Sequence, residues 1–294
     1  MGRWGGKKYF LNFHNFSPPP AVLTLKAGPL AGRQVQPLEP DYDKLLALAA
    51  QAGFRLLESG AEIYRVEESI HRILLAYGAP SAEVFAIPNC IIVSLTAPGG
   101  QPLTQIRRMP PHSTDLDQLE RYNDLCRRLC RDTPPPEQAL SMLEEIHRTR
   151  HIYPPWVQIL GSLLGGGMFT LFFGGMWMDA LCGGLCGVAI WLCLFFTGRL
   201  GANVFFKTVA GGAVSALLAL ALDRLGLSRN VDLVIIGALM ALVPGVAITN
   251  AMRDIMAGDM VAGISKGAEA LLIGAAIALG TALALGAVSL LGGG

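Results

Sequence analysis

The sequence predicts an α-helical integral membrane protein with about five transmembrane helices, preceded by a small α+β domain. Two observations predict this fold class: apolar runs follow one another from residue 156 onward, and most charged residues lie before residue 155. Lipid offers the backbone no hydrogen bonds, so segments within a membrane are helices or closed barrels. The predicted organisation is a leader at residues 1–40, a polar domain at 41–152 and a membrane domain at 153–294.

Five apolar runs are considered as membrane crossings. The first, 156–178, has about 23 residues without a charge and as a helix reaches about 34 Å, enough to cross a bilayer. The second, 180–196, is short and rich in Gly and Cys, so a re-entrant hairpin with the first run is the alternative to a crossing. The remaining runs are 204–222, 231–249 and 261–291.

Composition argues against several functional classes. The net charge is +1, which does not favour a nucleic-acid surface. Of the 23 Lys and Arg residues 17 precede Pro155, as do 16 of the 22 acidic residues, so the polar domain is nearly balanced in charge. The six cysteines lack zinc spacing, and no Walker loop, dinucleotide fingerprint or nucleophile elbow is found. We therefore expect no metal, no cofactor, no catalytic residues and no enzyme.

Residues 1–40 contain scattered aromatic residues and a run of three prolines, without helical or strand periodicity. No apolar stretch of the length of a signal peptide follows Lys7 and Lys8. A disordered leader and a start codon placed too far upstream are the two main interpretations. A docking tail for a small partner is the third.

The polar domain is predicted to combine helices with a small sheet. A helix begins near Asp41, where Asp41 or Asp43 can cap it. Three β-branched runs separated by Pro and Gly turns predict an antiparallel sheet, with a hairpin between the last two. The predicted strands are 83–87, 90–96 and 103–108, and the predicted helices that follow are 115–131 and 137–150.

One polar pattern stands out in this domain. Glu58, Glu62, Arg65, Ser69 and Arg72 are spaced by four, three, four and three residues, so on one helix they form a single polar stripe. The simplest interpretation is a solvated face with ion pairs, each worth a few tenths of a kcal/mol.

Charged residues within the apolar runs are candidates for a transport path, because a charge at the bilayer centre costs about 2.5–3.5 kcal/mol on insertion scales. Asp179, Asp232 and Lys266 fall near the ends of runs and can reach the interface. Lys207 and Glu269 lie a turn or two inside, and we expect that they can pair across helices.

The fourth run carries the strongest local signal. Pro244 and Gly245 interrupt an apolar helix and free backbone carbonyls that can face a cavity. Asn250 and Asp254 follow, one helical turn apart, with Asp259 beyond them. Transporters often place a substrate site beside such a break. A proline kink followed by an interfacial loop is the alternative interpretation.

Glycines recur in the apolar runs, and small residues are the usual contact between membrane helices. We therefore expect close helix packing at Gly161, Gly165, Gly183, Gly187, Gly211, Gly274, Gly280 and Gly286.

Basic residues predict the orientation. Arg148 and Arg150 precede the first run, and five crossings place Arg199 and Arg253 on the same side. Because basic residues are more frequent in cytoplasmic loops, the polar domain is expected in the cytoplasm.

Several motifs, taken together, resemble one known family over about residues 45–291. They are Glu58-Ser59-Gly60-Ala61-Glu62-Ile63-Tyr64-Arg65-Val66-Glu67, the turn at Pro88, Arg107-Arg108, Asn123, Pro244-Gly245, Asn250, Asp254 and Gly258-Asp259. This set looks like the bacterial threonine/serine exporter (ThrE) family.

The resemblance implies a multi-pass secondary exporter in the bacterial inner (plasma) membrane, with members linked to threonine and serine and a split-gene branch linked to succinate. Single-chain members carry a second membrane half, so the chain looks like the larger subunit of a two-component exporter. Its expected partners are the bilayer, a second smaller membrane subunit and a small-molecule substrate, and a higher oligomer is compatible. Glu58, Glu62 and Arg65 become candidates for a cytoplasmic gate or coupling site.

Two other functions remain open from the sequence. A membrane-tethered enzyme with a hydrolase-like polar domain is one, although no Ser-His-Asp or paired-carboxylate spacing supports it. A regulatory or scaffold subunit that does not transport is the other.

Overall fold

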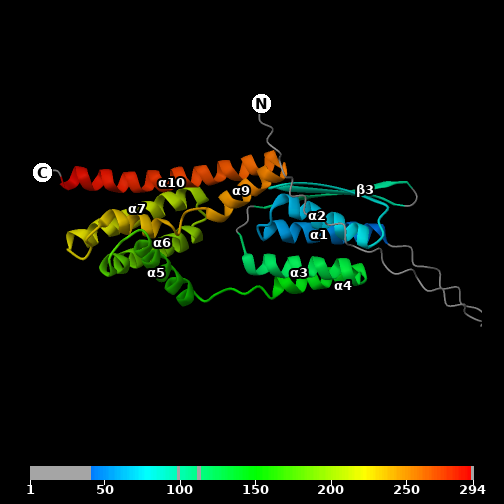
Figure 1. Cartoon of the computed structure of the whole chain (residues 1–294), viewed down its shortest axis with the longest axis horizontal. Coiled ribbons are helices and arrows are strands. Elements are labelled where there is room, and N and C mark those ends of the chain that lie inside the picture. Colours follow the sequence, from blue (N-terminus) through cyan, green and yellow to red (C-terminus); the bar gives the residue numbers. More distant parts are fainter. Residues whose placement is uncertain (1–40, 98–99, 111–113, 293–294) are drawn as a thin grey trace, which may run out of the picture. The chain divides into compact units, whose positions relative to one another are not determined.

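The computed structural model describes residues 41–97, 100–110 and 114–292, and the interpretation of residues 1–40 lies outside them. The described residues of the polar domain form three layers: a sheet, a middle pair of helices and an outer pair (Figure 1). The elements are α1 (Tyr42–Glu58), α2 (Ile63–Ala76), β1 (Ser81–Ile87), β2 (Cys90–Thr96), β3 (Pro102–Arg108), α3 (Leu116–Asp132) and α4 (Pro136–Arg148).

The helices of this domain begin where their capping residues predict. Asp41 accepts a hydrogen bond from the backbone N–H of Lys44 at 3.2 Å, and Asp115 does the same for Gln118 at 3.2 Å. Each aspartate thereby satisfies an N–H group that has no partner within the helix. Pro136 opens α4, where its missing N–H costs nothing. The predicted helices are confirmed to within a few residues.

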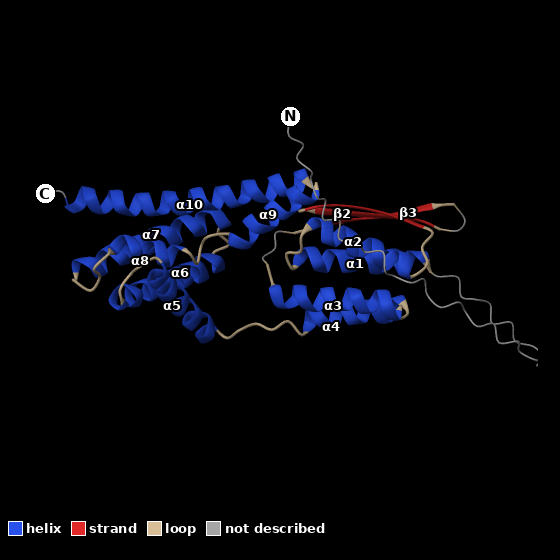
Figure 2. Ribbon diagram, in the orientation of Figure 1, coloured by secondary structure: helices blue, strands red, loops and turns tan. Residues whose placement is uncertain are grey.

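The predicted antiparallel sheet is also confirmed, with the strand order β1-β2-β3 (Figure 2). Alternate residues of the central strand, Ile91, Val93 and Leu95, are buried and belong to the core formed with α1 and α2. On the other face Phe85 pairs with Ile92 in the neighbouring strand. One face of the sheet therefore covers the middle helices.

The prediction that one continuous helix carries the polar stripe is wrong. α1 ends at Glu58, and Gly60 takes a left-handed conformation with φ +94°, which glycine adopts without strain. A new helix begins at Ile63, with Glu62 as its N-cap residue. A break therefore separates Glu58 from Glu62. Arg72 lies within α2, and Glu62 immediately precedes the first residue of that helix.

Within the described residues, four helices are long and apolar enough to cross a membrane. The second of them is a continuous helix of 23 residues, so it has the length of a full crossing rather than of a re-entrant hairpin. The first helix is shorter than its apolar run, because the chain turns at Gly174 with φ +99°. The four are α5 (Pro155–Phe172), α6 (Trp177–Arg199), α7 (Val204–Arg224) and α10 (Met260–Gly292).

The fourth apolar run forms two short helices, α8 (Val231–Leu239) and α9 (Gly245–Ala257), which confirms the predicted interruption. Pro244 cannot donate the hydrogen bond that would continue α8. Leu242, within the break, packs against Gly211 of α7. Gly211 lies seven residues, or about 10 Å, past the start of α7. The break therefore lies at the depth of the membrane helices.

Contacts between glycines and neighbouring helices define how far α10 extends. Figure 1 shows α7 and α10 running in the same direction. Gly280 of α10 lies against Val209 of α7, and Gly212 of α7 lies against Ile277 of α10. The paired numbers differ by 71 and 65, so Val204 at the start of α7 is level with about residue 272 of α10.

From this register, residues 260–271 extend about 18 Å past the start of α7, at about 1.5 Å per residue. α9 packs on this extension, with Gly263 against Ala251 and Ile255. We call α9 together with residues 260–271 the α9–α10 hairpin. This hairpin extends from the membrane helices to the polar domain, where α9 contacts α2 (Figure 1).

Glycines allow the closest helix contacts, and α5 meets α6 through them. A Cβ atom added at Gly166 would clash with the backbone oxygen of Gly183. The packing prediction is confirmed for Gly183, Gly187, Gly211 and Gly280. It is wrong, within the described residues, for Gly161, Gly165, Gly274 and Gly286, where an added Cβ would meet nothing within 4 Å.

The α5–α6 contact gives a stability prediction. Gly166→Leu should lower the melting temperature of the detergent-solubilised chain, because overpacking typically costs about 1–3 kcal/mol. Gly161→Leu, on the same helix with open space around it, should melt close to the unchanged chain. Equal melting temperatures for the two variants would contradict this packing.

Candidate functional site

The middle and the last turn of α9 dock onto the break between α1 and α2. Asn250 Nδ2 donates to the backbone oxygen of Gly60 at 3.0 Å, and the backbone N–H of Ile63 donates to Asp254 Oδ1 at 3.0 Å. The N–H of Ile63 is among the unpaired donors at the positive end of α2. Asp254 therefore caps α2 from a helix that lies far away in the sequence.

A second contact joins the same two elements through charge. Arg253 Nη1 donates to Glu62 Oε1 at 2.7 Å, and Arg65 Nε lies 3.4 Å from Glu62 Oε2. The carboxylate of Glu62 is 7% exposed, whereas the two arginine side chains are about half exposed. One nearly buried carboxylate is thus held between two guanidinium groups that reach solvent.

Asp254 also forms an ion pair with a residue of α10. Lys266 Nζ donates to Asp254 Oδ2 at 2.9 Å, and the side chain of Asp254 is fully buried. A buried carboxylate is tolerated when its oxygens are hydrogen-bonded and its charge is paired. Asp254 meets both conditions by joining α2, α9 and α10.

A pocket of about 540 Å³ opens beside these contacts. It lies between the start of α9, the α1–α2 break and the first turn of α3, and it combines charged, polar and apolar side chains. The lining residues are Gly60, Glu62, Arg65, Leu116, Leu119, Gly245, Val246, Thr249, Asn250 and Arg253.

Acidic groups around the junction differ in their pKa. Burial opposes the ionisation of Glu62, but a backbone hydrogen bond and its two arginine neighbours outweigh this, and the pKa of Glu62 is lowered. Burial raises the pKa of Glu67, although one of its oxygens accepts from Ala86 N–H at 2.7 Å. The pKa of Asp259 is raised by burial and by the nearby charge of Asp254. Glu62 is therefore the acidic group best held as an anion.

A family model described as "Putative threonine/serine exporter" matches residues 47–288. The chain belongs to this ThrE family. Together with the four helices long enough to span, this makes it a multi-pass membrane protein of an exporter family.

Two relatives of this ThrE-family chain are informative. It is 25% identical over 235 residues to a "Probable threonine/serine exporter" of Mycobacterium tuberculosis (strain ATCC 25618 / H37Rv), covering 80% of the chain and 44% of that protein. It is 29% identical over 132 residues to "Pheromone-regulated membrane protein 10" of Yarrowia lipolytica (strain CLIB 122 / E 150), covering 42% of the chain and 10% of that protein. The chain thus matches less than half the length of either relative. No solved structure matches it.

Among the predicted path residues of the ThrE-family chain, Asn250 and Asp254 contact the polar domain, and Gly245 and Asn250 line the pocket. Pro244 lies at the start of α9 and lines the apolar groove, and Asp259 follows the other end of α9, next to Asp254. Asn250 and Asp254 bind the polar domain, rather than facing a cavity between membrane helices.

Lys207 and Glu269 are not part of this arrangement. No ion pair joins them among the described residues, so the expected pairing is wrong. Lys207 Nζ approaches Gly198 at the end of α6. Glu269 is exposed and lies on the part of α10 that extends beyond the start of α7.

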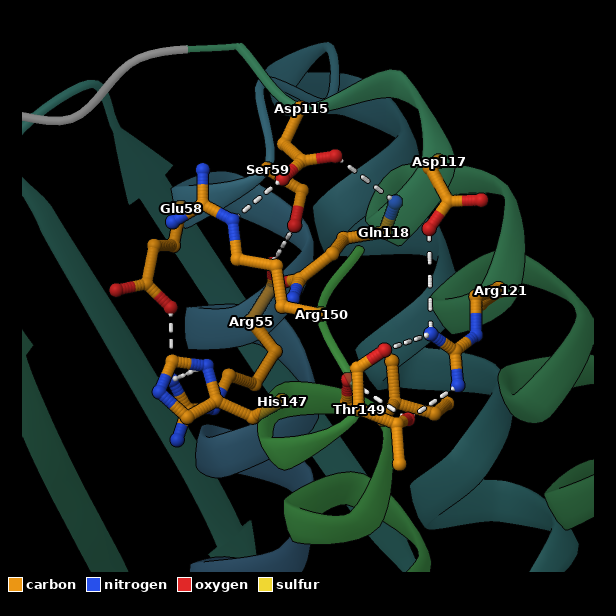
Figure 3. A network of polar contacts seen from close by, with 11 residues as sticks. Arg55, Glu58, Ser59, Asp115, Asp117, Gln118, Arg121, His147, Thr149 and Arg150 are labelled. Carbon is orange, nitrogen blue, oxygen red and sulfur yellow. Dashed lines mark hydrogen bonds and ion pairs between the residues drawn. The ribbon is translucent and has the colours of Figure 1, made fainter. Parts of the chain in front are cut away.

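Glu58 belongs to a separate network inside the polar domain (Figure 3). Arg55 Nη1 donates to Glu58 Oε2 at 2.8 Å and lies 2.9 Å from His147 Nδ1, while Arg55 Nη2 donates to Glu144 at 3.1 Å. Through Arg55, Glu58 fastens α4 to α1. The role of Glu58 as a gate residue remains a prediction without a contact to the pocket.

Asp179 has a structural role at the other end of the helices. Its carboxylate accepts from the backbone N–H groups of Met176 at 3.0 Å, Arg229 at 2.7 Å and Asn230 at 3.2 Å. It thereby caps α6 and holds the connection that leads into α8. This explains why a 1% exposed aspartate is found in an apolar run.

Sequence reasoning did not single out Arg253 and Lys266 for the site. The sequence held a clue to each of these two residues. Arg253 lies between Asn250 and Asp254 on the same short helix. Lys266 lies about two turns into α10, from where its side chain can reach back to α9. Their acceptors, Glu62 and Asp254, were identified.

Asp254→Asn tests the buried pair. The change leaves the charge of Lys266, 15% exposed, without its partner, and removing one member of a buried pair typically costs about 3–5 kcal/mol. The melting temperature in detergent should fall clearly. Glu68→Gln, which breaks the exposed pair with Arg72, is the control and should change stability by no more than about 0.5 kcal/mol. A fall no larger than that of the control would exclude a structural role for Asp254.

Proposed function

We propose that this chain is the larger subunit of a two-component secondary exporter in the bacterial inner membrane. It moves small polar metabolites, threonine and serine or a dicarboxylate such as succinate, together with a second, smaller membrane subunit. Threonine and serine are supported by the description of the matching family and by the name of the M. tuberculosis relative, whereas the dicarboxylate rests on the resemblance to the split-gene branch alone.

The observation that carries the proposal is the broken fourth run. α8 stops at membrane depth, and α9 continues from the break directly to a polar pocket on the polar domain. A broken membrane helix frees backbone groups only where they line a cavity or contact protein. A polar solute that enters at the pocket reaches the break at Pro244 and Gly245 without crossing an intact helix.

The polar domain is the cytoplasmic end of this route. Arg148 and Arg150 precede α5, Arg199 ends α6 and Arg253 lies in the α9–α10 hairpin, and all four belong to the same end of the helices. The predominance of basic residues at cytoplasmic ends supports this orientation. Glu62 and Arg65 then lie where a cytoplasmic gate is needed, with Asp259 and Glu269 nearby on the hairpin and Lys207 one turn into α7.

The α9–α10 hairpin carries the surface that we propose as the contact for the second subunit. An apolar groove of about 700 Å³ lies between α9 and α10 over residues 243–255 and 263–277. Much of it lies beyond the start of α7, on the extension described above. The groove includes the 77% exposed Leu271 and 54% exposed Met252. An apolar helix of the smaller subunit is the occupant that we propose, because the M. tuberculosis relative is more than twice as long as the segment matched here.

Efflux from bacterial cells that lack their own exporters tests the function. Cells loaded with threonine, serine or succinate should export one of them when the chain is made together with its candidate small partner, and not with either alone. Asn250→Ala should lower that efflux about tenfold or more at an equal amount of protein in the membrane, because it removes the bond to Gly60.

The control is Met256→Ala, on the same helix with a 76% exposed side chain outside the pocket. Normal efflux by Asn250→Ala would remove the assigned site. No efflux of any substrate by the complete pair would contradict the exporter itself.

Co-purification in mild detergent tests the partner surface. Leu271→Lys should separate the tagged chain from the small subunit, because a charge in the apolar groove cannot be buried without a partner. Leu272→Lys, at the same depth but outside the groove, should retain the partner. Retention by both variants, or loss by both, would exclude this groove as the contact.

A further inference from the structure

Two basic side chains lie together where α6 ends and α7 begins. Arg199 is the last residue of α6, and Lys207 lies in the first turn of α7. A Cβ atom added at Gly198 would lie 3.8 Å from Lys207 Nζ, so the ammonium group lies over the residue next to Arg199. Two positive charges are therefore found at adjacent positions at this end of α6.

No acidic partner offsets these two charges. Within residues 41–97, 100–110 and 114–292, neither Arg199 nor Lys207 forms a hydrogen bond or an ion pair. Like charges repel, and the repulsion grows where little water screens them, as at the edge of a bilayer. An anion that contacts both groups would convert this repulsion into attraction. The pair is thus suited to a negatively charged ligand.

The guanidinium group of Arg199 is held in position by an aromatic ring. Its central carbon lies 4.4 Å from the centroid of the Phe195 ring, and Phe195 stacks on Trp191 with centroids 5.2 Å apart. Trp191 Nε1 donates to Gln158 Oε1 at 3.1 Å, which fastens this column to α5. Stacking uses the face of a guanidinium group, so its N–H groups stay available in the geometry that a phosphate accepts.

Apolar side chains surround the two cations. Phe196, Leu200 and Phe206 are exposed, on or next to helices with the length and composition of membrane spans. They are placed to contact acyl chains. Both cations lie within one turn of a helix end, where long basic side chains extend from the hydrocarbon toward the phosphates of the lipid layer. A ligand at this position meets phosphate-binding groups and an apolar surface together.

We propose that the ends of α6 and α7 bind an anionic phospholipid, with its phosphate between Arg199 and Lys207 and its acyl chains along Phe196 and Phe206. The phosphate of phosphatidylglycerol fits this pair, because its headgroup carries one negative charge and no cation. A zwitterionic headgroup brings a positive charge toward two others and binds more weakly. The bound lipid bridges the two helix ends.

Lipid binding to the purified full chain in mild detergent tests the inference without a transport measurement. Native mass spectrometry with titrated lipid should show saturable binding of phosphatidylglycerol, and phosphatidylcholine should bind at least about tenfold more weakly. Glycerophosphoglycerol, which is the same headgroup without acyl chains, should also bind at least about tenfold more weakly than the lipid, since it forgoes the apolar contacts.

Substitutions locate the site. Arg199→Gln and Lys207→Gln should each weaken phosphatidylglycerol binding about fivefold or more, because each basic residue beside an anionic lipid contributes about that factor. Arg199→Lys should keep most of the affinity, which separates loss of charge from loss of structure. The control is Arg224→Gln, at the other end of α7 beside Asp223, and it should bind as the unchanged chain does.

Equal affinity for the two lipids, or unchanged binding by both glutamine variants, would overturn the inference. Glycerophosphoglycerol binding as tightly as the lipid would show a site for a soluble phosphate, and an equal loss in Arg224→Gln would show an effect of net charge alone; either result also overturns it. The comparison of the two lipids uses the unchanged chain, so it decides the question even where a variant does not fold.

Discussion

The junction between the polar domain and the membrane helices depends on the buried carboxylate of Asp254. One of its oxygens accepts the N–H of Ile63 and the other the ammonium group of Lys266, so three helices meet at one side chain. A fully buried charge is costly unless both oxygens are satisfied. This requirement fixes the position of α9 relative to the start of α2. As a result Asn250 lies against Gly60, and Arg253, one turn further along α9, lies against Glu62.

Two helix breaks meet at this junction. Gly60 separates α1 from α2, and the segment before Gly245 separates α8 from α9. Each break leaves backbone groups that a continuous helix would have paired, and the polar pocket forms where the two are brought together. In the Glu62–Arg253 contact the arginine side chain is half exposed and open to water, whereas both members of the Asp254–Lys266 pair are sheltered. This combination gives a junction with one sheltered contact and one that is open to water.

Local patterns in the sequence were sufficient for much of the fold. The capped helices, the antiparallel sheet and the apolar runs each depend on neighbouring residues, so spacing and composition predicted them. The break at Pro244 was predictable because proline lacks the N–H group that a helix needs. The break at Gly60 was missed, since a lone glycine is tolerated inside helices and only the packing around it shows that its φ is positive.

The sequence by itself determined which residues are polar within an apolar half and how Asn250 and Asp254 are spaced, because transfer energies and the helical repeat are local properties. Tertiary structure decided their partners: Asp254 binds Ile63 across 191 residues of chain, and Glu58 binds Arg55 instead of joining Glu62. Such contacts depend on how whole helices pack. Spacing along the chain carries no information about that packing once a break separates two charged residues.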